Sequence, residues 1–215
     1  MKYAIVTLYD APYASLAEYT WKQNKVVYAE KHGYFHTAKT DNFYGSNPGF
    51  DKIWFLNDIL EQNQNLEWIW WTGCDTLITN MTIKIEDRID DNYHLIAAGD
   101  CNADINADSF IIRNSPFGRE YIKKIMSFEP EYRNHGWREN QVMINLYHEH
   151  KDKIKILPQR EINAYECAIH PSQPTTDKLG NDGDWKHGDF LIHWPATPLS
   201  MRIDLAKKYM EKVIY

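Results

Sequence analysis

The chain has 215 residues, of which 43% are hydrophobic and 25% charged, and its formal net charge is −6 at neutral pH. This composition is typical of globular proteins and excludes wholesale disorder, and the length suits one domain with a sizeable core. The acidic balance argues against a nucleic-acid groove, which needs a basic surface. We expect one domain over residues 1–215, either the whole protein or one domain of a longer chain, with no nucleic-acid partner.

The cysteines and the apolar runs indicate the compartment. Cys74, Cys101 and Cys167 are too scattered for a zinc knuckle and odd in number, which indicates reduced, intracellular thiols. The sequence shows no signal-peptide core and no apolar run near 20 residues, so we expect no membrane span. A soluble cytoplasmic protein is the prediction.

The first half of the chain alternates strand-like and helix-like patterns. In chain order they predict a strand (3–8), a helix (14–31), a second strand (34–39), a surface loop (41–49) and a second helix (50–62). Trp68–Trp71 is a bulky uncharged run, typical of a strand buried on both faces of a parallel sheet. This alternation predicts a parallel sheet covered by helices.

The second half predicts mixed strands. Strands over 93–99 and 109–113 are separated only by a polar loop over 100–108, so this region should be antiparallel or mixed. The next pattern predicts a helix that begins at Ser115-Pro116. After it we expect a loop (129–136), a helix (138–150), a strand (154–157), a long loop (170–188), a strand (190–193) and a final helix (198–213). The expected fold class is α/β, Rossmann-like, with a mixed, mostly parallel central sheet flanked by helices.

Asp75 is the first charged residue after the tryptophan-rich strand. In open α/β sheets, ligands bind beyond the carboxyl ends of the strands, so a carboxylate here is placed to hold a metal ion. An aspartate that only hydrogen-bonds its own turn is the other interpretation. Spacing alone leaves both open.

Several short motifs occur in a fixed order along most of the chain: Lys25-x-x-Tyr28-Ala29-x-x-His32-Gly33-Tyr34, Asp51-Lys52-Ile53, Glu67-Trp68-Ile69-Trp70-Trp71, Asn106–Asn114, Glu139-Asn140-Gln141 and Phe190–His193. Together they resemble GT-A glycosyltransferases of the galactosyl, mannosyl and xylosyl transferase family numbered 34. The chain also resembles glycosyltransferases that modify the capsid glycoproteins of chlorella viruses. That resemblance implies a viral capsid glycan as acceptor and the host cytoplasm as location.

Two positions depart from the family pattern. The family's metal motif is Asp-x-Asp, whereas this chain has Gly73-Cys74-Asp75, so the first carboxylate is missing. Asp108 stands where the family usually has glycine, which adds a carboxylate near the expected sugar site.

The resemblance implies a metal-dependent retaining glycosyltransferase that moves a hexosyl, deoxyhexosyl or pentosyl group. The donor would be a nucleotide-diphosphate sugar, most simply a UDP-sugar, and the acceptor a glycan or glycoprotein. Asp75 and His193 would hold Mn²⁺ or Mg²⁺, because carboxylate and imidazole ligands suit Mn²⁺. Glu139 and Asp108 would be the catalytic carboxylates at the donor sugar.

Further residues are expected to bind the donor. The alternative is a strand end that merely turns for Thr7–Asp10, a helix residue that faces solvent for Gln141, and a solvated surface lysine for Lys52 and Lys186. These residues share a place beside the base, the diphosphate or the sugar hydroxyls: Thr7, Leu8, Tyr9, Asp10, Lys52, Gly73, Cys74, Asn106, Gln141 and Lys186. Trp137, Trp185 and Trp194 are expected to stack on acceptor sugars, and the loop over 170–188 to act as a lid.

Other functions stay open at this point. Retention can proceed through a covalent glycosyl-carboxylate or by front-face attack. A nucleotide-sugar hydrolase or a nucleotidyltransferase could use a similar sheet, although Thr7–Tyr13 lacks the Gly/Lys/Arg-rich loop of the latter. The absent carboxylate at Gly73 also fits a non-catalytic domain that binds carbohydrate or nucleotide. No motif specifies the donor sugar, the linkage or an oligomeric state.

Overall fold

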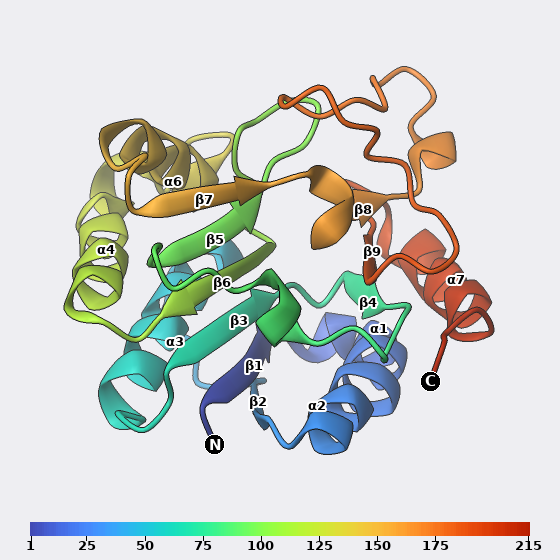
Figure 1. The fold of residues 1–215 in the computed structure, drawn as a ribbon, viewed down its shortest axis with the longest axis horizontal. Coiled ribbons are helices and arrows are strands. Elements are labelled where there is room, and N and C mark those ends of the chain that lie inside the picture. Colours follow the sequence, from blue (N-terminus) through green and yellow to red (C-terminus); the bar gives the residue numbers. More distant parts are fainter.

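A six-stranded central sheet forms the middle of the molecule in the computed structural model, which describes residues 1–215 (Figure 1). Its strand order is β2-β1-β3-β6-β5-β7. The strands are β1 (Tyr3–Leu8), β2 (Phe35–Lys39), β3 (Trp68–Thr72), β5 (Leu95–Ala98), β6 (Ser109–Arg113) and β7 (Ile154–Leu157). β1 is parallel to β2 and β3, and β5 is parallel to β7, whereas β6 is antiparallel to both β3 and β5. The sheet is therefore mixed and mostly parallel, as predicted.

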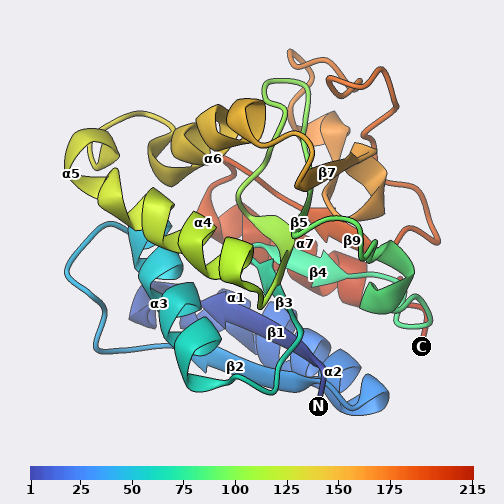
Figure 2. The ribbon, with the colours of Figure 1, turned by 60° about the vertical axis from the view of Figure 1, so that its left-hand side comes forward.

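Helices cover both faces of this sheet. The first predicted helix is one continuous segment made of α1 (Ala14–Ala17), the π-helical η2 (Glu18–Lys25) and α2 (Val26–His32). The others are α3 (Pro48–Gln62), α4 (Pro116–Ser127), α5 (Glu129–Tyr132), α6 (Arg138–Glu149) and α7 (Leu199–Met210), with short 3-10 turns at Ala11–Tyr13, Ile85–Arg88, Gln159–Glu161 and Cys167–Ile169. Helices α3, α4 and α6 lie on one face, and α1, α2 and α7 on the other (Figures 1 and 2). None of them has the length and apolar character needed to span a bilayer.

The hydrophobic core has two halves, one on each face of the sheet. Side chains alternate along a strand, so Trp68 and Trp70 join the half beneath α1, α2 and α7, while Ile69 and Trp71 join the half beneath α3, α4 and α6. All of β3 is buried. This agrees with the prediction of a central strand covered on both faces.

A second, three-stranded sheet was not predicted as a sheet, although one of its strands was expected over residues 190–193. It consists of β4 (Thr76–Ile78), β9 (Leu191–His193) and β8 (Ala164–Tyr165), with β4 antiparallel to β9. Strands of three and two residues are too short to show a period in the sequence. Their register matters because it pairs Thr76 with His193, which places His193 beside the end of β3.

Two other segments differ from expectation. The predicted loop over 129–136 begins with helix α5, whose Glu129-Pro130 start carries proline in its first turn, a common helix-start signal. Figure 2 shows α5 after the end of α4 and near α6. The long loop over 170–188 lacks helices and strands, as predicted, but is held by isolated bridges such as Thr176 to Asp182.

Candidate active site

A cavity of about 680 Å³ opens at the carboxyl ends of β1 and β3. Binding pockets for small molecules typically measure ~300–1,000 Å³ and lie at this edge of α/β sheets. β6 runs antiparallel, so its first residue lies at the same edge as the last residue of β3. The walls come from the end of β1, the turn after β3, the loop before β6 and the first turns of α3 and α6, and include Leu8–Asp10, Gly73–Asp75, Asn106–Asp108, Lys52 and Glu139.

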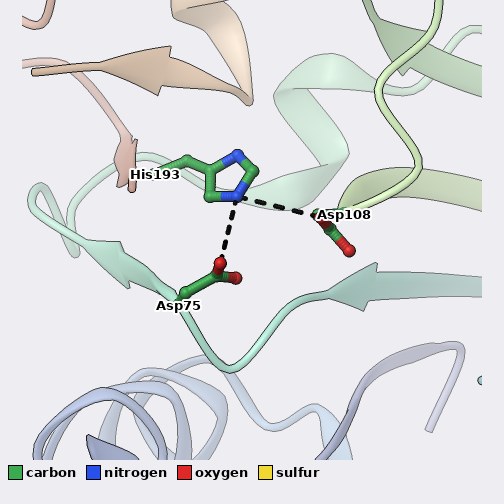
Figure 3. A group of neighbouring side chains, drawn as sticks. All are labelled: Asp75, Asp108 and His193. Carbon is green, nitrogen blue, oxygen red and sulfur yellow. Dashed lines mark ion pairs between the residues drawn. The ribbon is translucent and has the colours of Figure 1, made fainter. Parts of the chain in front are cut away.

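Three side chains from different elements converge in this cavity region (Figure 3). The Nε2 atom of His193 lies 3.6 Å from Oδ2 of Asp75 and 3.9 Å from Oδ2 of Asp108. One ligand atom from each residue can be chosen so that all lie within 4.8 Å of one another. Ligands at ~2.0–2.6 Å from one hard cation can be up to about 5 Å apart, so these three could hold a divalent cation with small movements.

Asn163 sets the tautomer of the neutral His193 ring. The side-chain NH₂ of Asn163 donates to the carbonyl of Gly99 at 3.1 Å, which leaves its Oδ1 facing Nδ1 of His193 at 2.8 Å. Because that oxygen can only accept, Nδ1 carries a hydrogen, and in the neutral ring Nε2 therefore presents a lone pair. Nε2 is fully buried and has no hydrogen-bond partner. A histidine with one nitrogen oriented by a hydrogen bond and the other free is arranged as a metal ligand.

Asp75 is held as an anion by its surroundings. The Nη2 atom of Arg202 lies 2.9 Å from its Oδ2. Burial acts to raise the pKa of Asp75, but a positive charge on the His193 ring and then the Arg202 guanidinium outweigh it and hold this pKa well below the usual range. When the His193 ring is neutral, Arg202 remains as the positive partner of this carboxylate. Arg202 is itself fixed, because its Nε donates to the carbonyl of Trp194 at 2.9 Å and its Nη1 to the hydroxyl of Tyr13 at 3.1 Å.

The turn that carries Asp75 is tied to the π-helical segment η2. The Nζ atom of Lys25 donates to the carbonyls of Gly73 at 2.9 Å and Thr76 at 2.7 Å, and the Thr20 hydroxyl donates to the carbonyl of Cys74 at 2.7 Å. Hydrogen bonds in a π-helix join residues five apart, so Thr20 and Lys25 lie one turn apart on the same face. Lys25 is completely buried, which lowers its pKa to about 8.

A second charged group links Asp108 to α6. The Nζ atom of Lys52 lies 3.2 Å from Oδ1 of Asp108, 2.8 Å from Oε1 of Glu139 and 2.8 Å from the carbonyl of Ala107. Burial acts to lower the pKa of Lys52, but Asp108 and Glu139 together raise it, so the ammonium stays charged. A Cβ atom on Gly49 would lie 1.8 Å from Oε2 of Glu139, so any other residue at position 49 would displace this carboxylate.

The structure gathers most of the predicted donor-binding residues. Leu8, Tyr9, Asp10, Lys52, Gly73, Cys74 and Asn106 line the cavity, together with Asp75, Asp108 and Glu139. The side chain of Asp10 also accepts a hydrogen bond from the backbone N–H of Tyr13, so it caps the turn after β1. Burial raises the pKa of Cys74 to about 11, which keeps its thiol protonated.

Three predicted donor-binding residues lie outside the cavity wall. Thr7 is fully buried in β1, beneath the wall. Gln141 faces Asn145 one turn further along α6, and Asn140 takes the inward position instead, where its Oδ1 accepts from the N–H of Ala107 at 2.7 Å. Lys186 is exposed in the long loop and pairs with Asp182 and Asp184 there.

Of the three tryptophans expected to stack on an acceptor, one lines the cavity and two do not. Trp137 lines the cavity and is 47% exposed, so it can meet a ligand. Trp194 is fully buried and packs on Tyr209, so the expectation for Trp194 was wrong. Trp185 also packs on Tyr209, with ring centroids 4.9 Å apart, and neither it nor any other residue of the loop over 170–188 lines the cavity.

Sequence reasoning gave no role to Lys25, Asn163 or Arg202. Lys25 stood in a quoted motif, and a lysine that becomes completely buried needs partners, but its burial was not predictable from spacing. Asn163 and Arg202 carry no local signal. Both reach the site through the small sheet and α7, whose packing the sequence pattern does not specify.

Comparison with known proteins gives a consistent result. The model of a family described as the galactosyl transferase GMA12/MNN10 family matches residues 10–95 and 89–196. The alpha-1,2-galactosyltransferase of Schizosaccharomyces pombe is 27% identical over 218 residues, which cover 80% of this chain and 54% of that protein. The probable alpha-1,6-mannosyltransferase MNN10 of Saccharomyces cerevisiae is 26% identical over 185 residues, which cover 66% of this chain and 46% of that protein. The chain therefore spans about half the length of these relatives.

Among solved structures, a glycosyltransferase involved in the glycosylation of the major capsid of PBCV-1 superposes with a TM-score of 0.77. The alignment covers 97% of this chain and 100% of that chain, at 15% sequence identity. This likeness confirms the predicted GT-A fold. A capsid glycan as acceptor stays a prediction.

Proposed function

The chain belongs to the galactosyl transferase GMA12/MNN10 family, and we propose that it is a metal-dependent retaining glycosyltransferase that uses a nucleotide-diphosphate sugar. The observation that carries the proposal is the buried Nε2 atom of His193, which has no hydrogen-bond partner and faces the Asp75 carboxylate at the cavity. A structural histidine in a core would normally use both ring nitrogens or expose one.

Asp75 and His193 are the residues that would hold the cation. Oxygen and nitrogen ligands of this kind suit Mn²⁺, which binds carboxylate and imidazole together. A bound cation would offset the negative charge that develops on the departing diphosphate. Asn163 keeps the His193 ring in the ligating tautomer, and Lys25 and Thr20 keep the Asp75 turn in place.

The nucleotide would lie along the end of β1. Leu8 and Tyr9 offer an apolar wall and an aromatic ring to the base. Two fixed cations, Arg202 and Lys52, stand at the cavity and suit a diphosphate, whereas Lys186 is outside it. Arginine forms bidentate contacts with phosphate oxygens, so Arg202 is the better placed partner. We infer a UDP-sugar as donor.

The donor sugar would meet Glu139 and Lys52. The Glu139 carboxylate is 6% exposed and 2.8 Å from the Lys52 ammonium, and this pairing makes it a weak nucleophile. A fixed carboxylate of this kind can stabilise positive charge at the anomeric carbon. The geometry thus favours front-face transfer with retention over a covalent intermediate. Trp137, exposed at the cavity, would stack on a sugar ring of a glycan or glycoprotein acceptor.

Asp75→Asn provides the test of this function. We expect UDP release from UDP-galactose or UDP-glucose in the presence of Mn²⁺, and at least a ~100-fold loss of that turnover in Asp75→Asn with its melting temperature little changed. The matched control is Asp91→Asn, whose carboxylate is 75% exposed at the far end of the sheet and should not matter. Undiminished turnover of Asp75→Asn at saturating Mn²⁺ would remove this residue as a ligand.

A further inference from the structure

Residue 73 is a glycine, although a side chain at this position would point into the cation site. A Cβ atom built on Gly73 would lie 2.8 Å from Oδ1 of Asp75 and 3.4 Å from Cβ of Asp108. A side chain at position 73 would therefore start in van der Waals contact with the side chain of Asp108, and Oδ1 of Asp75 would have to move.

The pairing of β3 with β6 explains why residues 73 and 108 are direct neighbours. Thr72 is opposite Ser109 in the antiparallel register, and the N–H of Gly73 donates to the carbonyl of Asp108 at 2.7 Å. Cross-strand neighbours on one face bring their Cβ atoms to ~4.5–5.5 Å. At this edge of the sheet, a carboxylate can thus be presented by either strand.

The two oxygens of Asp108 have different surroundings. Oδ1 accepts from Lys52 at 3.2 Å, while Oδ2 faces Nε2 of His193 at 3.9 Å. Its side chain is 44% exposed, so it reaches the cavity. One oxygen orients the group and the other is left for a ligand.

Resting on the proposed function, we propose that Asp108 supplies from β6 the carboxylate ligand that glycine at position 73 cannot supply from β3. The cation site then consists of Asp75, Asp108 and His193. The unpartnered, buried Nε2 of His193 marks its centre independently of the two carboxylates. Asp108 is accordingly a ligand rather than the sugar-contacting group predicted from the sequence.

This arrangement connects the cation to the donor sugar. Lys52 contacts both Asp108 and Glu139, so a single ammonium positions one ligand of the cation and the carboxylate expected at the sugar.

Direct measurement of Mn²⁺ binding tests the proposal without relying on activity. The electron paramagnetic resonance signal of free Mn²⁺ is recorded during titration of the protein, with and without UDP. The variants are Asp108→Asn, Asp108→Gly, and the exchange Asp108→Gly with Gly73→Asp. Asp104→Asn is the control, because Asp104 belongs to the same loop but pairs with His148.

We expect Asp108→Asn and Asp108→Gly to weaken Mn²⁺ binding at least ~10-fold, since even the loss of an outer-shell partner costs ~10–100-fold. The Mn²⁺ affinity of the exchange variant should return to within about threefold of the wild-type value. The Asp104→Asn variant should have the wild-type affinity. Wild-type affinity in Asp108→Asn would overturn the proposal and leave the proposed function intact. Weak binding in both Asp108 variants without recovery in the exchange would overturn the equivalence of the two positions. Absence of Mn²⁺ binding by the wild type would contradict both this proposal and the proposed function.

Discussion

At the scale of single residues, His193 has the arrangement that a metal ligand would need. Its ring is completely buried, one nitrogen is committed to Asn163, and the other faces two carboxylates without a hydrogen bond. An unsatisfied buried polar atom costs about 1–3 kcal/mol. A cation at this nitrogen would remove that cost, so the site is organised before any ligand arrives.

Glu139 offers a separate test at this scale. We expect Glu139→Gln to lower kcat at least ~30-fold and to change the Kd for UDP less than threefold, because in the proposed function this carboxylate contacts the sugar rather than the nucleotide. Glu149→Gln, at the other end of α6, is the control. Kinetics with UDP-galactose and calorimetry with UDP provide the two constants. Equal losses in both would assign Glu139 to binding alone.

The sequence indicated some of these residues and missed others for definable reasons. Asp75 and His193 follow or end buried strands, so the position of the strand predicted the position of the side chain. For Gln141 the sequence left open a donor contact or a solvent-facing position, because only the α6 packing decides whether Asn140 or Gln141 faces inward. Lys186 has a suitable charge, but its loop directs it to local aspartates.

At the scale of elements, the π-helical segment η2 acts as the support of the Asp75 turn. Lys25 and Thr20 bond to its carbonyls, and Asn24 bonds both backbone groups of Ile78 in β4. Single-turn π segments inside helices are frequent at functional sites. The length of this helix was predictable from its period and its Gly33 stop, whereas the change in helix type was not.

Lys25 makes this support sensitive to pH. The unfolded chain keeps the Lys25 proton up to about pH 10.4, but the folded protein releases it near pH 8. Between these values the unfolded state binds more protons, so the free energy of unfolding rises with pH.

Comparison of the wild type with Lys25→Met isolates that contribution, because other titrating groups cancel. We expect the wild-type free energy of unfolding to rise by about 2 kcal/mol relative to Lys25→Met between pH 8 and pH 10. Urea unfolding at both pH values measures it. Parallel pH profiles for the two proteins would show that the lysine is not buried as the structure has it.

The large elements were predictable and the small ones were not. The six strands of the central sheet and its longer helices carry clear periods, as in Tyr3–Leu8 and Trp68–Thr72. β4 and β8 are too short for a pattern and form only because β9 lies between them. Since β4 and β9 set the distance between Asp75 and His193, the composition of the site could be predicted but not its geometry.

At the scale of the whole molecule, the site collects residues from distant parts of the chain. Leu8 comes from the first strand, Asp75 and Asp108 from the middle, and His193 and Arg202 from the last fifth. Helix α7 reaches Asp75 through Arg202, so the final helix is tied to the centre of the sheet. No short fragment of the chain contains this constellation, so we expect UDP to bind the folded protein and not the unfolded chain.

The most direct test of a cation-dependent nucleotide site is therefore thermal unfolding in the presence of UDP. The melting temperature is measured once with Mn²⁺ and once with EDTA. A ligand that binds only the folded state stabilises it by about 2.7 kcal/mol at 100 times its Kd, which for this size is a shift of several degrees. We predict a clear rise in melting temperature with UDP and Mn²⁺ together, and little or none with UDP in EDTA. An equal rise with and without Mn²⁺ would contradict the cation site, and no rise under either condition would contradict the nucleotide site itself.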